Sequence, residues 1–131
     1  MTGTARTFLA LAAALGFSSV ALGAFGAHAL KATFAAAADG ADRAAWWQTA
    51  THYVGVHALA LGLVAALLDR RDATSTVVSG WAFFVGACVF GGTLFTMAIT
   101  GQRWLGAITP LGGLSLLVGW AALFVTAIRQ G

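Results

Sequence analysis

Four long stretches of the chain carry no formally charged residue, and short polar connections separate them. The uncharged runs cover residues 7–30, 48–68, 74–102 and 104–128. As α-helices rising about 1.5 Å per residue, all four are long enough to cross the roughly 30 Å hydrocarbon core of a bilayer. Segments of about ten residues with strand-like alternation are absent from the sequence. The pattern therefore predicts an all-α membrane protein, an antiparallel four-helix transmembrane bundle with short loops.

The connections constrain how these helices pack. Residues 69–72 and 100–103 are too few for a crossover, so consecutive helices are expected to be antiparallel neighbours. The alanine-rich segment 31–45 is longer, and it suits a short helix on the membrane face, a turn at Gly40 and a helix cap at Asp42.

Tryptophans stand at the ends of two of the runs. Trp46 and Trp47 precede the second predicted helix, and Trp104 opens the fourth. Indole rings favour the interface between lipid and water, so we expect these three residues to be interfacial anchors.

Composition supports a membrane location. Of the 131 residues, 60% are hydrophobic and only 8% are charged, against roughly a quarter charged in soluble proteins. A chain of this length with no further segment able to fold separately is expected to form a single domain, residues 1–131. The N-terminal run is longer than the apolar part of a secretory signal, so it counts as the first membrane helix.

The net charge of +3 does not indicate nucleic-acid binding, because the basic residues are scattered at helix ends. One end of the predicted bundle carries four of them (Arg6, Arg70, Arg71, Arg129) and the other end carries three (Lys31, Arg43, Arg103). The positive-inside rule then favours cytoplasmic termini. The lone Cys88 excludes a disulfide within the chain and a cysteine metal cage, and it is interpreted as a small packing residue.

Small residues recur at helical spacing in each span. Lipid supplies no hydrophobic force between helices, so close backbone approach at such residues drives association, and these seams are expected to face the bundle interior. The glycines assigned to this packing are Gly16, Gly23, Gly26, Gly55, Gly62, Gly91, Gly112 and Gly119.

Ionisable groups inside a membrane span are costly and are therefore candidates for function. The sequence Gly26-Ala27-His28-Ala29-Leu30 is echoed by Gly55-Val56-His57-Ala58-Leu59, which places one histidine near the end of the first helix and another early in its partner. Two interpretations stay open: the imidazoles close structural hydrogen bonds, or they bind a ligand.

Topology is expected to gather the polar candidates at the membrane face that lies opposite the termini. An anionic or carbonyl-bearing small molecule fits cationic side chains better than a metal does, and no span contains a carboxylate to complete a familiar metal set. No cofactor is assigned. The hypothetical ligand-binding residues are His28, Lys31, His52, Tyr53, His57, Arg103 and Thr109.

Three segments resemble the domain-of-unknown-function 423 family, which is related to transmembrane protein 256 of animals. They are residues 23–31, residues 49–61 with Tyr53 and His57-Ala58-Leu59-Ala60-Leu61, and residues 104–120 with Trp104-Leu105-Gly106-Ala107-Ile108-Thr109-Pro110-Leu111-Gly112-Gly113 and Gly119-Trp120. The resemblance implies a small four-helix protein of the bacterial inner membrane without an established activity. The chain departs from the family pattern at Gln48, Val54, Val56 and Phe95.

Two functions remain in view. The chain lacks a nucleophile–base pair, so the first is a non-enzymatic accessory or assembly partner of a larger membrane complex. The second is a small-molecule-binding or transport protein with a His/Arg site at the outer face. Four helices are few for a transport pathway, so this second function requires an oligomer. The expected partners are the lipid bilayer and other membrane subunits or further copies of the chain, and not nucleic acid.

Overall fold

The computed structural model describes residues 1–130 and consists of four long helices with two short ones in the connections. The long helices are α1 (Gly3–His28), α3 (Gly40–Arg70), α4 (Thr74–Thr100) and α5 (Thr109–Gln130). The short ones are α2 (Lys31–Ala36) and a 3-10 helix, η1 (Arg103–Ala107). The first three long helices, and η1 together with α5, are long and apolar enough to cross a membrane. The predicted all-α class with four membrane-length helices is therefore confirmed.

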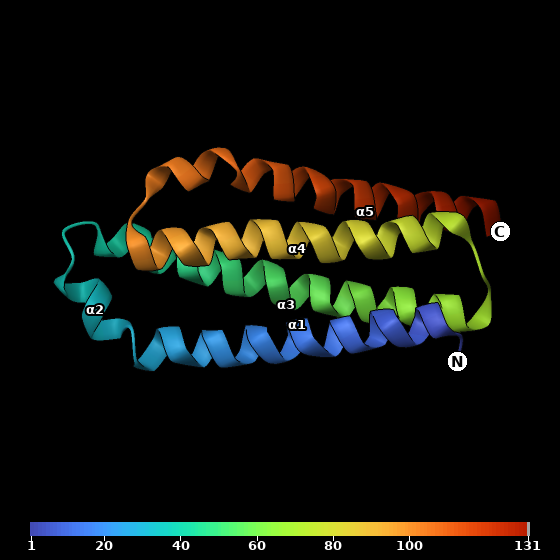
Figure 1. Ribbon diagram of the computed structural model, residues 1–131, viewed down its shortest axis with the longest axis horizontal. Helices are drawn as coiled ribbons and strands as arrows, with labels where there is room; N and C mark the ends of the chain where they lie inside the picture. Colours follow the sequence, from blue (N-terminus) through green and yellow to red (C-terminus); the bar gives the residue numbers. More distant parts are fainter. Residues whose placement is uncertain (131) are drawn as a thin grey trace.

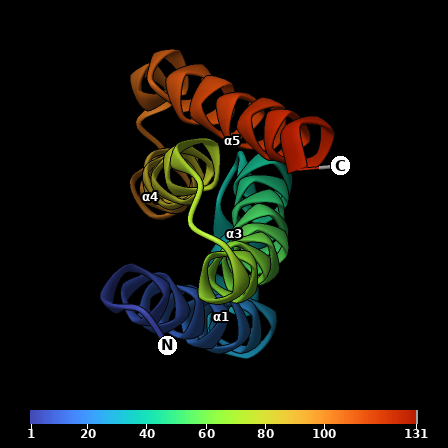
Figure 2. The same ribbon diagram turned by 90° about the vertical axis from the view of Figure 1, so that its right-hand side faces the viewer.

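The helices form a layered stack. Figures 1 and 2 show α1 and α5 on opposite sides of the central pair α3 and α4. Backbone contacts follow the chain order, from α1 to α3, α3 to α4 and α4 to α5. Both termini lie at one end of the stack, and α2 and η1 lie toward the other (Figure 1). We call the latter the loop end.

The contact between α1 and α3 depends on glycines that let side chains of α3 approach the α1 backbone. A Cβ atom added at Gly23 would lie 3.1 Å from Thr51 Cγ2, and one added at Gly26 would collide with the Trp47 indole. Further along, the Ser19 hydroxyl donates to the Thr51 carbonyl oxygen at 3.0 Å. Because there is no water to compete in a bilayer, such close approaches and interhelical hydrogen bonds hold the two helices together.

Trp47 has the largest side chain among the residues that join α1 to α3. Its indole Nε1–H donates to the Leu22 carbonyl oxygen of α1 at 2.8 Å, and the side chain is only 5% exposed. The rings of Phe25, Phe34 and Phe95 surround it, the last at 4.7 Å between centroids. The expectation that Trp47 is an interfacial anchor is therefore wrong, because the ring points into the protein and ties α1, α2 and α4 to α3.

Hydroxyl groups hold α4 and α5 together along their length. Ser79 donates to the Gly119 carbonyl oxygen and Ser115 to the Ala82 carbonyl oxygen, both at 2.8 Å. Pairs of hydroxyls lie toward the two ends of this contact. They are Thr93 with Thr109 at 2.7 Å, Ser75 with Thr126 at 2.7 Å, and Thr76 with Thr126 at 3.1 Å. Each hydroxyl can donate and accept, so these groups satisfy one another inside the protein.

The other glycines assigned to packing differ in their surroundings. A Cβ atom would press on Ser19 at Gly55, on Val54 at Gly91, on the Phe90 backbone at Gly112 and on the Phe83 ring at Gly119. Gly16 has only an ordinary contact with the Ala58 Cβ atom, at 3.9 Å. Gly62 has nothing within 4 Å of a built Cβ atom, so it departs from the expectation that it packs inside the bundle.

Two further expectations are corrected. Helix α3 begins at Gly40, where the Phe34 carbonyl passes too close for any Cβ atom, so Asp42 lies inside the first turn and is not the cap. Cys88 is exposed on α4, so it is not a packing residue of the interior.

Gly26 and Gly62 allow a matched test of packing. Gly26→Ala should lower the free energy of unfolding in mild detergent by about 1–3 kcal/mol, because the new methyl group overlaps the Trp47 indole. Gly62→Ala should be neutral or stabilising by up to about 1 kcal/mol, because alanine favours a helix and the space is open. Equal effects of the two substitutions in denaturant titrations would contradict the packing described for Gly26.

Candidate functional site

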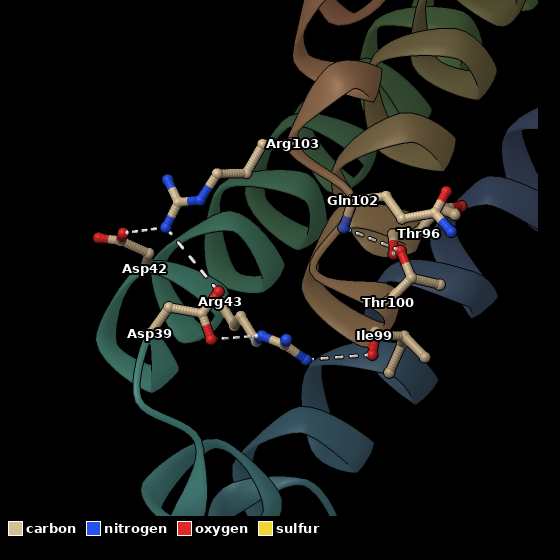
Figure 3. Close-up of polar contacts among 8 residues, drawn as sticks. All are labelled: Asp39, Asp42, Arg43, Thr96, Ile99, Thr100, Gln102 and Arg103. Carbon is tan, nitrogen blue, oxygen red and sulfur yellow. Dashed lines mark hydrogen bonds and ion pairs between the residues drawn. The ribbon is translucent and has the colours of Figure 1, made fainter.

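A network of ion pairs lies at the loop end and consists of Asp39, Asp42, Arg43 and Arg103 (Figure 3). The Arg103 guanidinium lies 2.8 Å from the Asp42 carboxylate and 3.8 Å from that of Asp39. Its Cζ atom sits 5.0 Å from the centroid of the Trp46 ring, a cation–π distance. Arg103 is therefore already paired with side chains of α3 and its cap.

Arg43 links the same network to the end of α4. Its Nε atom lies 2.8 Å from Asp39 Oδ1, and its Nη1 donates to the Ile99 carbonyl oxygen at 3.3 Å (Figure 3). A cation is stabilised there because the last carbonyl groups of a helix are unpaired and carry partial negative charge. Gly101, with φ at 72°, ends α4 in a left-handed turn against the Arg43 guanidinium. These contacts give Arg43 and Asp39 a structural role in joining α3 to α4.

His57 lies within the helices and has both ring nitrogens engaged. Nδ1 donates to the Tyr53 carbonyl oxygen at 2.7 Å, and Nε2 accepts from the Trp120 indole N–H at 3.1 Å. An imidazole that donates at one nitrogen and accepts at the other is neutral. His57 is 4% exposed, and its hydrogen bond to Trp120 is a direct polar link between α3 and α5.

The structure separates His57 from the other two residues expected beside it. Arg103 pairs with Asp42, which precedes His57 by 15 residues in α3, or about 22 Å of helix. Gly16 faces Ala58 across the seam, so His28 lies about 18 Å further along α1 than the level of His57. The expected meeting of these residues at one end of the bundle is therefore corrected: His57 lies deep among the helices.

The remaining candidates fall into different surroundings. His28 and Lys31 are exposed at the loop end, near the junction of α1 and α2. His52 is exposed on α3, and its ring contacts that of Tyr53 edge to face at 5.7 Å. Thr109 bonds to Thr93 and to the Leu105 carbonyl oxygen, which makes it part of the contact between α4 and α5.

A cleft between α3 and α5 is lined by two expected site residues, Tyr53 and His57, and by Trp120, which was not among the expected site residues. The cleft has a volume of about 530 Å³, and its lining includes Tyr53, His57, Phe90, Pro110 and Trp120. The Tyr53 and His57 rings are nearly parallel, with centroids 6.1 Å apart. This cleft can hold an apolar or aromatic group, because aromatic rings and leucine side chains line it.

Three residues that shape these sites were outside the expected set: Trp120, Asp39 and Arg43. Trp120 had a detectable signal, because an indole N–H in the middle of a membrane span requires an acceptor and His57 is one of few available. The pair of Asp39 and Arg43 could have been found from their spacing of four residues, which suits an ion pair on one helix face.

The bond between Trp120 and His57 can be tested by removing its donor. Trp120→Phe should lower the free energy of unfolding by about 1–3 kcal/mol, because it leaves the Nε2 atom of His57 without a partner in apolar surroundings. Trp104→Phe serves as control and should change the free energy of unfolding by less than about 0.5 kcal/mol, because Trp104 is 63% exposed and its indole donates to the exposed Gln102 side chain. If both variants unfold at the same denaturant concentration, the hydrogen bond to His57 contributes nothing to stability.

The chain is similar to known membrane proteins over nearly its full length. The model of the family described as "Protein of unknown function (DUF423)" matches residues 22–113. The UPF0382 inner membrane protein YgdD of Escherichia coli K12 is 40% identical over 126 residues, which cover 96% of this chain and 92% of that protein. The UPF0382 membrane protein YwdK of Bacillus subtilis is 36% identical over 126 residues, covering 95% of this chain and 98% of that protein. No solved structure matches the chain.

The matched segment contains α3, α4 and the polar network, and the similarity to YgdD and YwdK extends over nearly the full length of each protein. The chain is therefore an integral membrane protein that belongs to the DUF423 family and is similar to the UPF0382 membrane proteins YgdD and YwdK.

Proposed function

We propose that the protein is a non-enzymatic accessory or assembly partner of a larger complex in the bacterial inner membrane. The observation that carries this proposal is the use of the candidate polar groups within the protein itself. Both ring nitrogens of His57 are bonded, and Arg43 and Arg103 are paired with carboxylates. A catalytic group needs a free lone pair or proton within reach of a substrate. The lone pairs and protons of these side chains are used in contacts that join the helices.

The outward face of α4 supports association with another subunit. Gly92 is exposed, and a Cβ atom built on it would meet nothing within 4 Å. Cys88 and Thr96 lie one turn before and one turn after it and are also exposed. Small side chains on a membrane-facing surface allow a second helix to approach closely, and packing inside this chain makes no use of Gly92.

A pull-down with a matched pair of variants tests this function. A tagged chain extracted in mild detergent should recover a membrane subunit in fixed stoichiometry, and Gly92→Leu should abolish the recovery without changing the melting temperature. Ala10→Leu, on an exposed part of α1, should leave recovery intact. A wild-type chain that purifies without any stoichiometric protein, or a Gly92→Leu variant that recovers it fully, would contradict the proposal.

The cleft between α3 and α5 favours a second candidate function, the binding of a small molecule. The Tyr53 side chain lines this cleft, and its hydroxyl makes no hydrogen bond with the residues that the structure describes. A carbonyl-bearing apolar molecule would give that hydroxyl an acceptor. On this hypothesis Tyr53→Phe keeps the fold and removes ligand-dependent thermal stabilisation, whereas a wild-type chain with no response to a broad panel of such molecules contradicts it.

The orientation that we propose places both termini in the cytoplasm. The terminal end carries four basic residues (Arg6, Arg70, Arg71, Arg129), and the loop end carries three (Lys31, Arg43, Arg103). YgdD is named an inner membrane protein, and the same membrane is proposed for this chain. The larger number of basic residues at the terminal end, four against three, favours its retention on the cytoplasmic side.

Labelling of single cysteines tests the orientation. In a Cys88→Ala background, Ala41→Cys at the loop end should react with an impermeant thiol reagent on intact cells, and Asp72→Cys between α3 and α4 should react only after lysis. Both positions are exposed, so accessibility in the folded chain does not separate them. The opposite labelling pattern would reverse the assignment.

A further inference from the structure

Three neighbouring hollows run along the contact of α1 with α2 and α3. The first lies at the loop end, has a volume of about 480 Å³ and is lined by Lys31 and Gln48. The second, of about 270 Å³, shares Gln48 with the first and continues to Thr51 and His52. The third, of about 790 Å³, shares Thr51 and His52 with the second and extends to Leu59 and Gly62. Because each hollow shares lining residues with the next, we call the three together the α1–α3 groove.

The polarity of the α1–α3 groove falls along a single face of α3. Gln48 and His52 are one turn apart and exposed, and Val56 and Leu59 follow on the same face, 39% and 79% exposed. The groove is therefore polar at the loop end and apolar further in. A lipid in the leaflet at that end has the same order of polarity, with its polar head group at the surface and its apolar chains further in.

The length of the apolar part fits one leaflet. From Thr51 to Gly62 the groove follows 11 residues of α3, or about 16 Å of helix. Half of a hydrocarbon core of roughly 30 Å is about 15 Å. An acyl chain that starts beside His52 would therefore end near Gly62, and Gly62 leaves room for it because nothing lies within 4 Å of a built Cβ atom.

The charge at the polar end selects the head group. Arg43 and Arg103 are both paired with carboxylates at 2.8 Å. Lys31 forms no ion pair with the residues that the structure describes, and it lines the first hollow. A lysine held at a membrane surface attracts phosphate by charge-assisted hydrogen bonds, and the amide of Gln48, which lines the same hollow, can donate to a phosphate or ester oxygen.

We propose that the α1–α3 groove is a binding site for one anionic phospholipid, with its phosphate at Lys31 and Gln48 and an acyl chain along Val56, Leu59 and Gly62. The site is independent of the protein partner and of the cleft between α3 and α5. It explains why the chain keeps an open glycine and an unpaired lysine on the same groove, 31 residues apart in sequence.

Native mass spectrometry of the purified chain in detergent, with added phosphatidylglycerol or phosphatidylcholine of identical acyl chains, tests the proposal. The wild-type chain should retain one phosphatidylglycerol in preference to phosphatidylcholine. Lys31→Gln should weaken phosphatidylglycerol binding about five-fold, the value of one lysine near a membrane surface. Arg71→Gln removes the same charge from the exposed terminal end and should leave binding unchanged.

Two further arms separate the head group from the acyl chain. Gly62→Leu fills the apolar end and should weaken binding of both lipids, with the melting temperature of the lipid-free chain retained. Glycerol phosphate should fail to compete at concentrations that match the lipid. The proposal is overturned by equal retention of the two lipids, by equal effects of Lys31→Gln and Arg71→Gln, or by full competition from glycerol phosphate. Loss of a protein subunit from Gly62→Leu with lipid retained would overturn it also, and would make the groove a helix-docking surface.

Discussion

The rest of the structure depends on the packing of the Trp47 indole against Gly26. The indole N–H also donates a hydrogen bond to the Leu22 carbonyl oxygen. The Trp47 side chain is only 5% exposed, so its N–H group is out of reach of water and must find its acceptor in the protein. It finds one in the backbone of α1, which is reachable because Gly26 has no side chain. The Trp47 ring also contacts the rings of Phe34 and Phe95, so α2 and α4 pack against the same residue.

The same constraint, that polar groups inside the membrane must be satisfied by the protein, accounts for the other long-range contacts. The His57 Nε2 atom accepts a hydrogen bond from the Trp120 indole N–H, Ser79 and Ser115 donate to carbonyl groups across the contact of α4 with α5, and the buried Thr76 and Thr126 bond to each other. At the loop end, carboxylates and guanidinium groups neutralise one another over the ends of three helices. In each case a side chain that could serve chemistry serves assembly of the fold, which is why the proposed function is that of a partner and not of a catalyst.

The number and approximate limits of the membrane helices could be predicted from the sequence, because charge is costly in hydrocarbon and its absence marks each span. The rotation of each helix about its axis could not. In a soluble helix the polar face reveals the buried one, but in these spans both faces are apolar, so Trp47, Cys88 and Gly62 were each placed on the wrong side. The partner of His57 could not be predicted for the same reason. The sequence located His57 on its helix, but its hydrogen bond to Trp120 depends on how α5 lies across α3.

A double-mutant cycle between Gly26→Ala and Trp47→Ala tests the central claim most directly. The new methyl group at position 26 should destabilise the fold only while the indole is present, so the two substitutions should couple by at least about 1 kcal/mol in the free energy of unfolding. In the Trp47→Ala background, Gly26→Ala should be neutral or slightly stabilising. Additive effects, with Gly26→Ala equally destabilising in both backgrounds, would contradict the claim that the Trp47 contact is what requires a glycine at this position.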